Sequence, residues 1–90
     1  MADAAIKIKI MPDSPEANLS EITKKAKSAI EAEQGTVVNV EEEPVAFGLK
    51  AIIITLTRDE SLDQDPLTEP LEKILHVSSV QIIDFRRIGF

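Results

Sequence analysis

The sequence contains no cysteine, which excludes disulfides, thiolate metal sites and a cysteine nucleophile. It has three aromatic residues and a formal net charge of −6. A protein that binds nucleic acid by neutralising phosphates is normally basic and exposes aromatic rings for stacking. We therefore expect no direct binding to nucleic acid. The acidic composition instead favours solubility and attraction to a basic protein partner.

Long hydrophobic runs are also missing. The longest unbroken apolar run covers residues 51–54, far short of the ~20 residues that a membrane span requires. Residues 1–5 lack the basic and continuous apolar segments of a secretory signal. We therefore expect a cytoplasmic protein that does not enter a membrane. A chain of 90 residues, 43% hydrophobic and 29% charged, is expected to form a single domain over residues 1–90.

The first half of the chain predicts a strand, a helix and a second strand. Residues 5–10 alternate isoleucines with Lys7 and Lys9, which indicates a strand with one wet face. A helix is expected over residues 19–34, capped by Asn18 and stopped by a left-handed Gly35. Residues 36–40 are β-branched and continue into three glutamates, as in an exposed edge strand protected by charge.

The second half predicts an interior strand, a helix and a closing strand. Residues 49–57 form the most apolar segment, and residues 58–65 are expected to form a loop. A helix opened by Pro66 and capped by Asp65 should bury one face, and His76 should then donate to carbonyls of its last turn. That apolar face consists of Leu67, Leu71, Ile74 and Leu75. Residues 77–88 form a strand with a bulge near Ile82 and Ile83.

This order of elements predicts an α+β fold, the ferredoxin-like βαββαβ sandwich. Its four-stranded antiparallel sheet would carry two helices on one face, with the first and third strands in the centre. The other face would present Lys7 and Lys9 to solvent or to a partner.

The sequence shows no recognisable site for chemistry. It has no Gly-rich phosphate loop, no Ser/His/Asp set and no His/Cys cluster. Of the three glutamates at 41–43, alternation in a strand leaves two on one face, and no nearby Asp or His completes an oxygen shell. We therefore expect no catalytic residue, no metal and no cofactor, and a protein that is not an enzyme.

A Pro-to-Gly corner lies between two apolar, β-branched runs, residues 36–40 and 49–57. Pro44 gives no N–H to a ladder and Gly48 adopts angles that other residues resist, so the two bracket a bend. Phe47 stands between them, either tucked under the turn as a plug or held out as an anchor for a partner. Composition alone favours the plug, because apolar side chains are mostly buried.

The chain resembles the translation elongation factor 1-beta family in its short archaeal form. The most specific match is the corner at residues 44–51, Pro-Val-Ala-Phe-Gly-Leu-Lys-Ala. The acidic approach at 41–44 and the closing residues 84–88, Asp-Phe-Arg-Arg-Ile, also match. The resemblance implies a guanine nucleotide exchange factor that promotes GDP release from elongation factor 1-alpha and so supports regeneration of its GTP form.

The resemblance also implies roles for individual residues. In the family, the aromatic residue of the Phe-Gly corner inserts into the GTPase, so Phe47 becomes an anchor, with Gly48 shaping the approach. Lys50 is either a polar contact nearby or simply a charged end of a strand. Eukaryotic relatives carry a lysine next to the C-terminus, where this chain has Phe90. The nearest cations are Arg86 and Arg87, which either contact the partner or form structural salt bridges.

A second interpretation comes from a different class of protein. The predicted fold and an open sheet face with Lys7, Lys9 and Ile53 also suit a ligand-sensing regulatory domain that dimerises through its sheet. An exchange factor, by contrast, is expected to be a monomer when free.

Overall fold

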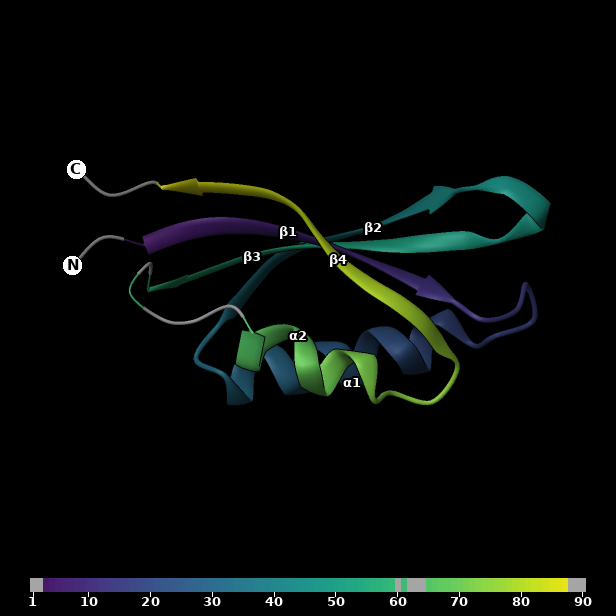
Figure 1. The fold of residues 1–90 in the computed structure, drawn as a ribbon, viewed down its shortest axis with the longest axis horizontal. Helices are drawn as coiled ribbons and strands as arrows, with labels where there is room; N and C mark the ends of the chain where they lie inside the picture. The colour runs from purple at the N-terminus through teal and green to yellow at the C-terminus, as the bar shows by residue number, and fades with distance from the viewer. Residues whose placement is uncertain (1–2, 60, 62–64, 88–90) are drawn as a thin grey trace.

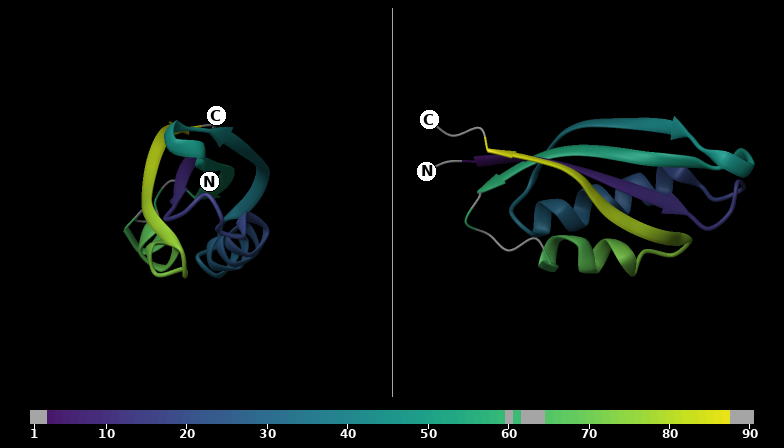
Figure 2. Two further views of the ribbon diagram at one scale, coloured as in Figure 1. Left: turned by 90° about the vertical axis from the view of Figure 1, so that its right-hand side faces the viewer. Right: turned by 45° about the horizontal axis from the view of Figure 1, so that its top comes forward.

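The computed structural model describes residues 3–59, 61 and 65–87, and four antiparallel strands form one sheet in the order β2-β3-β1-β4. The strands are β1 (Asp3–Pro12), β2 (Thr36–Pro44), β3 (Lys50–Asp59) and β4 (Val77–Arg87). The helices α1 (Leu19–Ala32) and α2 (Asp65–Glu72) both lie against the same face of the sheet (Figures 1 and 2). The predicted ferredoxin-like α+β fold is confirmed, including the central position of β1 and β3.

The core lies between the sheet and the two helices. Alternation along β1 and β3 places one side chain in two on the helix-facing side, where the isoleucine-rich segments of both strands are fully buried. The helices contribute a matching stripe at helical spacing. The buried cluster contains Ile6, Ile8, Ile10, Ile52, Ile54 and Leu56 from the sheet, and Ile22, Ala26, Ile30, Leu67 and Leu71 from the helices.

Both edge strands contain a β-bulge. In β4, Ile8 pairs with Ile82 and Lys7 with Asp84, so Ile83 is the extra residue and the predicted bulge is confirmed. In β2, the pairing shifts between Val37 and Asn39, which leaves Val38 as a second bulged residue that the sequence did not indicate. Bulges interrupt the regular edge of a sheet and so oppose pairing with another chain.

The end of α1 differs from the expectation. The helix begins as predicted, with the Asn18 side chain accepting a hydrogen bond from Glu21 N at 3.2 Å, but it ends at Ala32. The left-handed residue is Gln34, with φ 66°, and not Gly35. Gly35 N donates to Ile30 O at 2.9 Å and Gln34 N to Glu31 O at 3.1 Å, which together form a Schellman motif.

Gly35 is required because a side chain would not fit at this position, and not because its backbone is left-handed. A Cβ atom placed on it would lie 2.6 Å from Ile30 Cγ2 and 3.2 Å from Leu56 Cδ1. The glycine therefore lets the chain leave α1 and enter β2 directly against the core.

The loop predicted from residue 58 onward begins too early, because β3 extends through Arg58 to Asp59. Arg58 is buried, and its Nε donates to the carbonyl of Glu33 at 3.1 Å. This bond satisfies a carbonyl at the end of α1. The expected Asp65 cap of α2 depends on a side chain outside the described part of the chain, and so does the expected strand residue Ile88.

The end of α2 requires two corrections. The helix stops at Glu72, so helical spacing no longer applies to Leu75, which is 68% exposed and not buried as predicted. His76 has φ 71°, and its Nδ1 lies 3.5 Å from Asp13 Oδ2. Its side chain therefore faces the loop after β1 and not the last carbonyls of α2. Neither α1 nor α2 is long and apolar enough to cross a membrane.

The second face of the sheet carries Lys7 and Lys9 as predicted, but it is less open than expected. Lys9 on β1 and Glu43 on β2 flank β3, and their charged groups approach to 3.8 Å. This pair reaches across β3 near Ala51 and Ile53, which are 0% and 8% exposed. Ile53 is therefore not available as a large apolar contact.

Candidate partner-binding site

The tip of the β2–β3 hairpin is a short, hydrogen-bonded turn. Val45 N donates to Leu49 O at 2.8 Å, and Leu49 N donates to Ala46 O at 3.3 Å. Between these bonds a 3₁₀ turn runs over Ala46–Gly48. The main chain of the tip is therefore held from both sides, directly beyond the last β2–β3 pair, Pro44 and Lys50.

Two successive residues of the tip have left-handed backbone angles. Phe47 has φ 63° and ψ 27°, and Gly48 has φ 74°. A Cβ on Gly48 would meet nothing within 4 Å, so the backbone angle and not space explains the glycine. For Phe47 the same region is unfavourable, since its Cβ crowds the following carbonyl. Residues with such angles cluster at functional sites.

The Phe47 ring is 93% exposed, the largest exposure of any bulky hydrophobic side chain in the described part of the chain. The buried-plug interpretation from composition is therefore wrong. Figure 1 shows the reason, because the hairpin projects past the ends of both helices. The role of Phe47 as an anchor remains a prediction that this exposure supports.

The surroundings of the tip are acidic. Glu41, Glu42 and Glu43 are all exposed on β2 as it approaches the turn. Lys50, the first residue of β3, is exposed on the opposite strand. The tip therefore offers a bare aromatic ring with a carboxylate-rich strand on one side and an ammonium group on the other.

Arg86 and Arg87 lie at the other end of the molecule. Arg87 pairs with Ala4, and Ala4 also pairs with Arg58, eight residues along β3 from Lys50. At about 3.3 Å per residue, this separation is about 26 Å. The structure therefore does not bring the two arginines together with the hairpin tip. In Figure 1 the hairpin and the chain termini lie at opposite ends of the long axis.

Arg86 takes part in an ion pair within its own strand. Its Nε lies 3.1 Å from Asp84 Oδ2, and 77% of the Arg86 side chain is exposed. This contact agrees with the structural salt-bridge interpretation of Arg86. It does not exclude a partner contact, because exposed ion pairs contribute little and exchange readily. Phe90, at the position of the eukaryotic lysine, lies outside the described residues.

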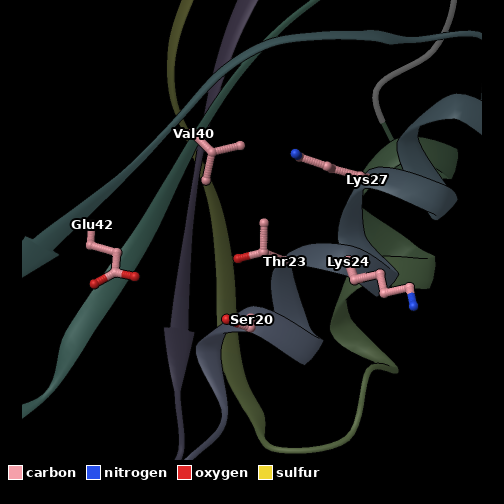
Figure 3. Close-up of a pocket in the computed structure, with 6 residues that line it drawn as sticks. All are labelled: Ser20, Thr23, Lys24, Lys27, Val40 and Glu42. Atoms are coloured by element: carbon pink, nitrogen blue, oxygen red, sulfur yellow. The ribbon is translucent and has the colours of Figure 1, made fainter.

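A separate hollow of about 380 Å³ lies between α1 and the edge strand β2 (Figure 3). In Figure 3 the Lys27 side chain extends toward Val40, whereas Lys24 points away. The hollow is lined by Ser20, Thr23, Lys24, Lys27, Val40 and Glu42. It is open and of mixed charge, and no group of three or more His, Cys, Asp or Glu side chains suited to a metal occurs among the described residues.

Comparison with known proteins decides the family. Residues 5–88 match the EF-1 guanine nucleotide exchange domain. The chain belongs to this family. It is 44% identical to elongation factor 1-beta of Methanosarcina acetivorans over 98% of this chain and 100% of that protein. It is also 33% identical to elongation factor 1-beta of Saccharolobus solfataricus over the full length of both.

The chain is therefore a guanine nucleotide exchange factor of translation elongation, as the resemblance implied. The family match favours this function over the ligand-sensing alternative, and the coverage of Ile53 removes part of the open sheet face on which that alternative depended. An exchange domain acts through a surface that contacts a GTPase. Among the described residues, the hairpin tip presents the most exposed bulky hydrophobic side chain.

Proposed function

We propose that this exchange domain promotes GDP release from elongation factor 1-alpha by binding it through the hairpin tip, with Phe47 as the anchoring side chain. The observation that carries the proposal is a 93% exposed ring on a hydrogen-bonded turn with left-handed backbone angles. Because the main chain is already ordered, binding costs little additional conformational entropy. Buried aromatic anchors of this kind commonly dominate protein interfaces.

The effect on nucleotide follows from linkage. A GTPase holds its nucleotide mainly through groups around the phosphates and a bound magnesium ion. If the exchange domain binds the nucleotide-free conformation more tightly, it must weaken nucleotide binding by the same factor. No bond in the nucleotide is made or broken, so the domain is not an enzyme. As a translation factor it acts in the cytoplasm.

The other predicted residues have supporting roles. Gly48 permits the backbone angle that aims the ring, and Lys50 supplies a cation beside it. Arg86 and Arg87 form a second contact with the GTPase at the opposite end of a molecule that is 42 Å long. The two contacts together require the GTPase to lie along the exchange domain and not only against its tip.

The free exchange domain is a monomer built from a single domain. Its two exposed sheet edges both carry bulges, at Val38 and Ile83, which oppose edge-to-edge pairing. On the sheet face away from the helices, the Lys9–Glu43 pair reaches across β3 near its hairpin end, and it opposes apolar packing of a second copy there.

The test is the release of a fluorescent GDP analogue from elongation factor 1-alpha with increasing exchange factor. This chain contains no Trp or Tyr, so neither its own fluorescence nor energy transfer from it interferes with the signal of the GDP analogue. Phe47→Ala keeps the Cβ atom and the backbone strain and removes only the ring. We expect a loss of at least about tenfold in the exchange rate per unit concentration, as for a central interface residue.

Val38→Ala is the matched control, because Val38 is 62% exposed and lies away from the tip. We expect it to keep the wild-type exchange rate. No acceleration by the wild-type protein would contradict the proposed partner. Equal rates for Phe47→Ala and Val38→Ala would contradict the role of the ring.

A further inference from the structure

The turn between α2 and β4 carries a second prominent apolar side chain. Leu75 is 68% exposed, next to Phe47 among the bulky hydrophobic residues of the described chain. Its neighbour Ile74 packs against the core, and Ile74 N donates to Leu71 O at 3.2 Å. In this turn, Ile74 is therefore directed toward the core and the adjacent Leu75 is directed to solvent.

This turn is fixed to the loop that follows β1. Asp13 N donates to His76 O at 2.8 Å, and the Asp13 carboxylate lies 3.5 Å from His76 Nδ1. Val77 N donates to Ile74 O at 3.2 Å. His76 has a left-handed backbone with φ 71°, as Phe47 does in the hairpin tip. Leu75 is therefore presented on an ordered backbone, which reduces the entropy lost on binding.

The Leu75 turn lies in the same half of the molecule as Phe47. Pro12, the last residue of β1, pairs with Val77, and Ile10 pairs with Ile52 near the hairpin. Figures 1 and 2 show the turn in the same half of the molecule as the hairpin, set back from the hairpin tip, with the β1–α1 loop between them. The two shorter dimensions of the molecule are 21 and 18 Å. An interface of ordinary size, about 800 Å² per partner, covers an end of these dimensions.

The surface beside Leu75 is polar and of mixed charge, because Glu21 and Lys25 line a small hollow together with Leu75. A hollow of about 360 Å³ next to the turn is lined by Ser14, Glu16, Ala17, Asn18, Glu21 and His76. An aliphatic side chain with a polar rim is the usual arrangement of a protein contact. The partner surface that fits it has an apolar recess with a polar border.

Exposure alone does not identify a contact, because isolated aliphatic residues are common on protein surfaces. Val38 is nearly as exposed as Leu75, at 62%. It lies at a bulge near the start of the edge strand β2. Its neighbour Val37 pairs with Leu56, six residues along β3 from Lys50 at the hairpin. Leu75 differs in its fixed turn and in lying in the same half of the molecule as Phe47.

We propose that Leu75 is a second apolar contact for the GTPase that Phe47 binds, so that the hairpin tip and the α2–β4 turn together form one interface. This inference rests on the proposed function. The hairpin supplies an aromatic anchor, and the turn supplies an aliphatic one on the far side of the β1–α1 loop. Two separated anchors fix the orientation of the exchange domain, which a single ring on a hairpin does not.

The experiment compares Leu75→Ser with Val38→Ser and Phe47→Ala in the full chain. Affinity for nucleotide-free elongation factor 1-alpha is measured by calorimetry, and the half-maximal concentration is taken from GDP-release curves. We expect Leu75→Ser to weaken binding about fivefold or more and to raise the half-maximal concentration equally. Val38→Ser should remain within about twofold of the wild type. Circular dichroism should show the same fold and similar melting for all three variants.

If Leu75→Ser binds like Val38→Ser while Phe47→Ala is impaired, the inference is wrong and the proposed function stands. If Phe47→Ala also binds normally, the proposed function fails as well. A photoreactive side chain at position 75 gives a test that does not depend on a serine variant folding. It should cross-link to the GTPase, whereas the same group at position 38 should not, and equal yields from the two positions would overturn the inference.

Discussion

Replacing Phe47 by glycine should make this protein more stable and less active. The residue adopts φ 63° and ψ 27°, which costs a residue with a side chain about 1–2 kcal/mol relative to glycine. The ring is 93% exposed, so its removal forfeits almost no buried surface. Burial of the ring therefore does not compensate for the backbone strain in the free protein. This is what we expect if the ring serves to bind a partner.

The size of the effect follows from two opposing contributions. Relief of the left-handed strain stabilises the folded state by about 1–2 kcal/mol. The extra freedom of glycine in the unfolded chain opposes this by about 0.4–1 kcal/mol. At the midpoints of these two ranges, the net gain is about 0.8 kcal/mol for Phe47→Gly. A gain of about 1 kcal/mol raises the melting temperature of a domain of this size by about 4–8 °C.

Urea denaturation followed by far-ultraviolet circular dichroism measures the change, because the chain has no Trp or Tyr for fluorescence. Phe47→Ala is the control, since alanine removes the ring but keeps the strained Cβ, and its stability should match the wild type. A ring that packed under the turn would instead make Phe47→Gly less stable by about 3 kcal/mol or more. Such a loss would refute both the exposure of the ring and its role as an anchor.

Two further predictions concern the fold. Gly35→Ala should destabilise the protein by about 1–3 kcal/mol in urea, because the new Cβ would lie 2.6 Å from Ile30 Cγ2; an unchanged midpoint would show that the core yields freely there. The Ser61 backbone N–H, and then its hydroxyl, lower the pKa of the Asp59 carboxyl. Asp59 thus stabilises the fold above roughly pH 4, and this contribution is lost as the pH falls through its folded-state pKa. Melting temperatures from pH 6 to pH 3 should show the wild type losing its advantage over Asp59→Asn, and a constant difference would contradict the assignment.

The arrangement of strands and helices was predictable because each element has a clear period. The alternating isoleucines of β1 and the long apolar run of β3 identified the two central strands, and Asn18 with Glu21 located the start of α1. The ends of elements were less predictable. Gly35 looked like the left-handed stop of α1, but tertiary packing against Ile30 and Leu56 explains that glycine, and Gln34 takes the strained position.

The candidate site was predictable in its location but not in its geometry. Pro44 and Gly48 marked a turn, yet composition alone would bury Phe47, because local sequence does not show that the hairpin extends past the helices. The exposure of Leu75 was missed for a related reason. Its spacing continues the apolar stripe of α2, and nothing local shows that the helix stops at Glu72 and that Asp13 binds the following turn.

If both groups of predicted contacts bind the GTPase, the central strand β3 contributes to the function. β3 begins at Lys50 beside the hairpin tip and reaches Arg58, whose Nε donates a hydrogen bond to the end of α1. Arg58 pairs with Ala4 of β1, and Ala4 also pairs with Arg87 of β4. A single strand therefore sets the separation of about 26 Å between the tip and the arginines. Its helix-facing side chains are fully buried, so the strand cannot bend without disturbing the core. If the GTPase binds to both ends of the exchange domain, the core keeps the two contacts at a fixed separation. The free energy of each contact can then be used to move one part of the GTPase relative to another.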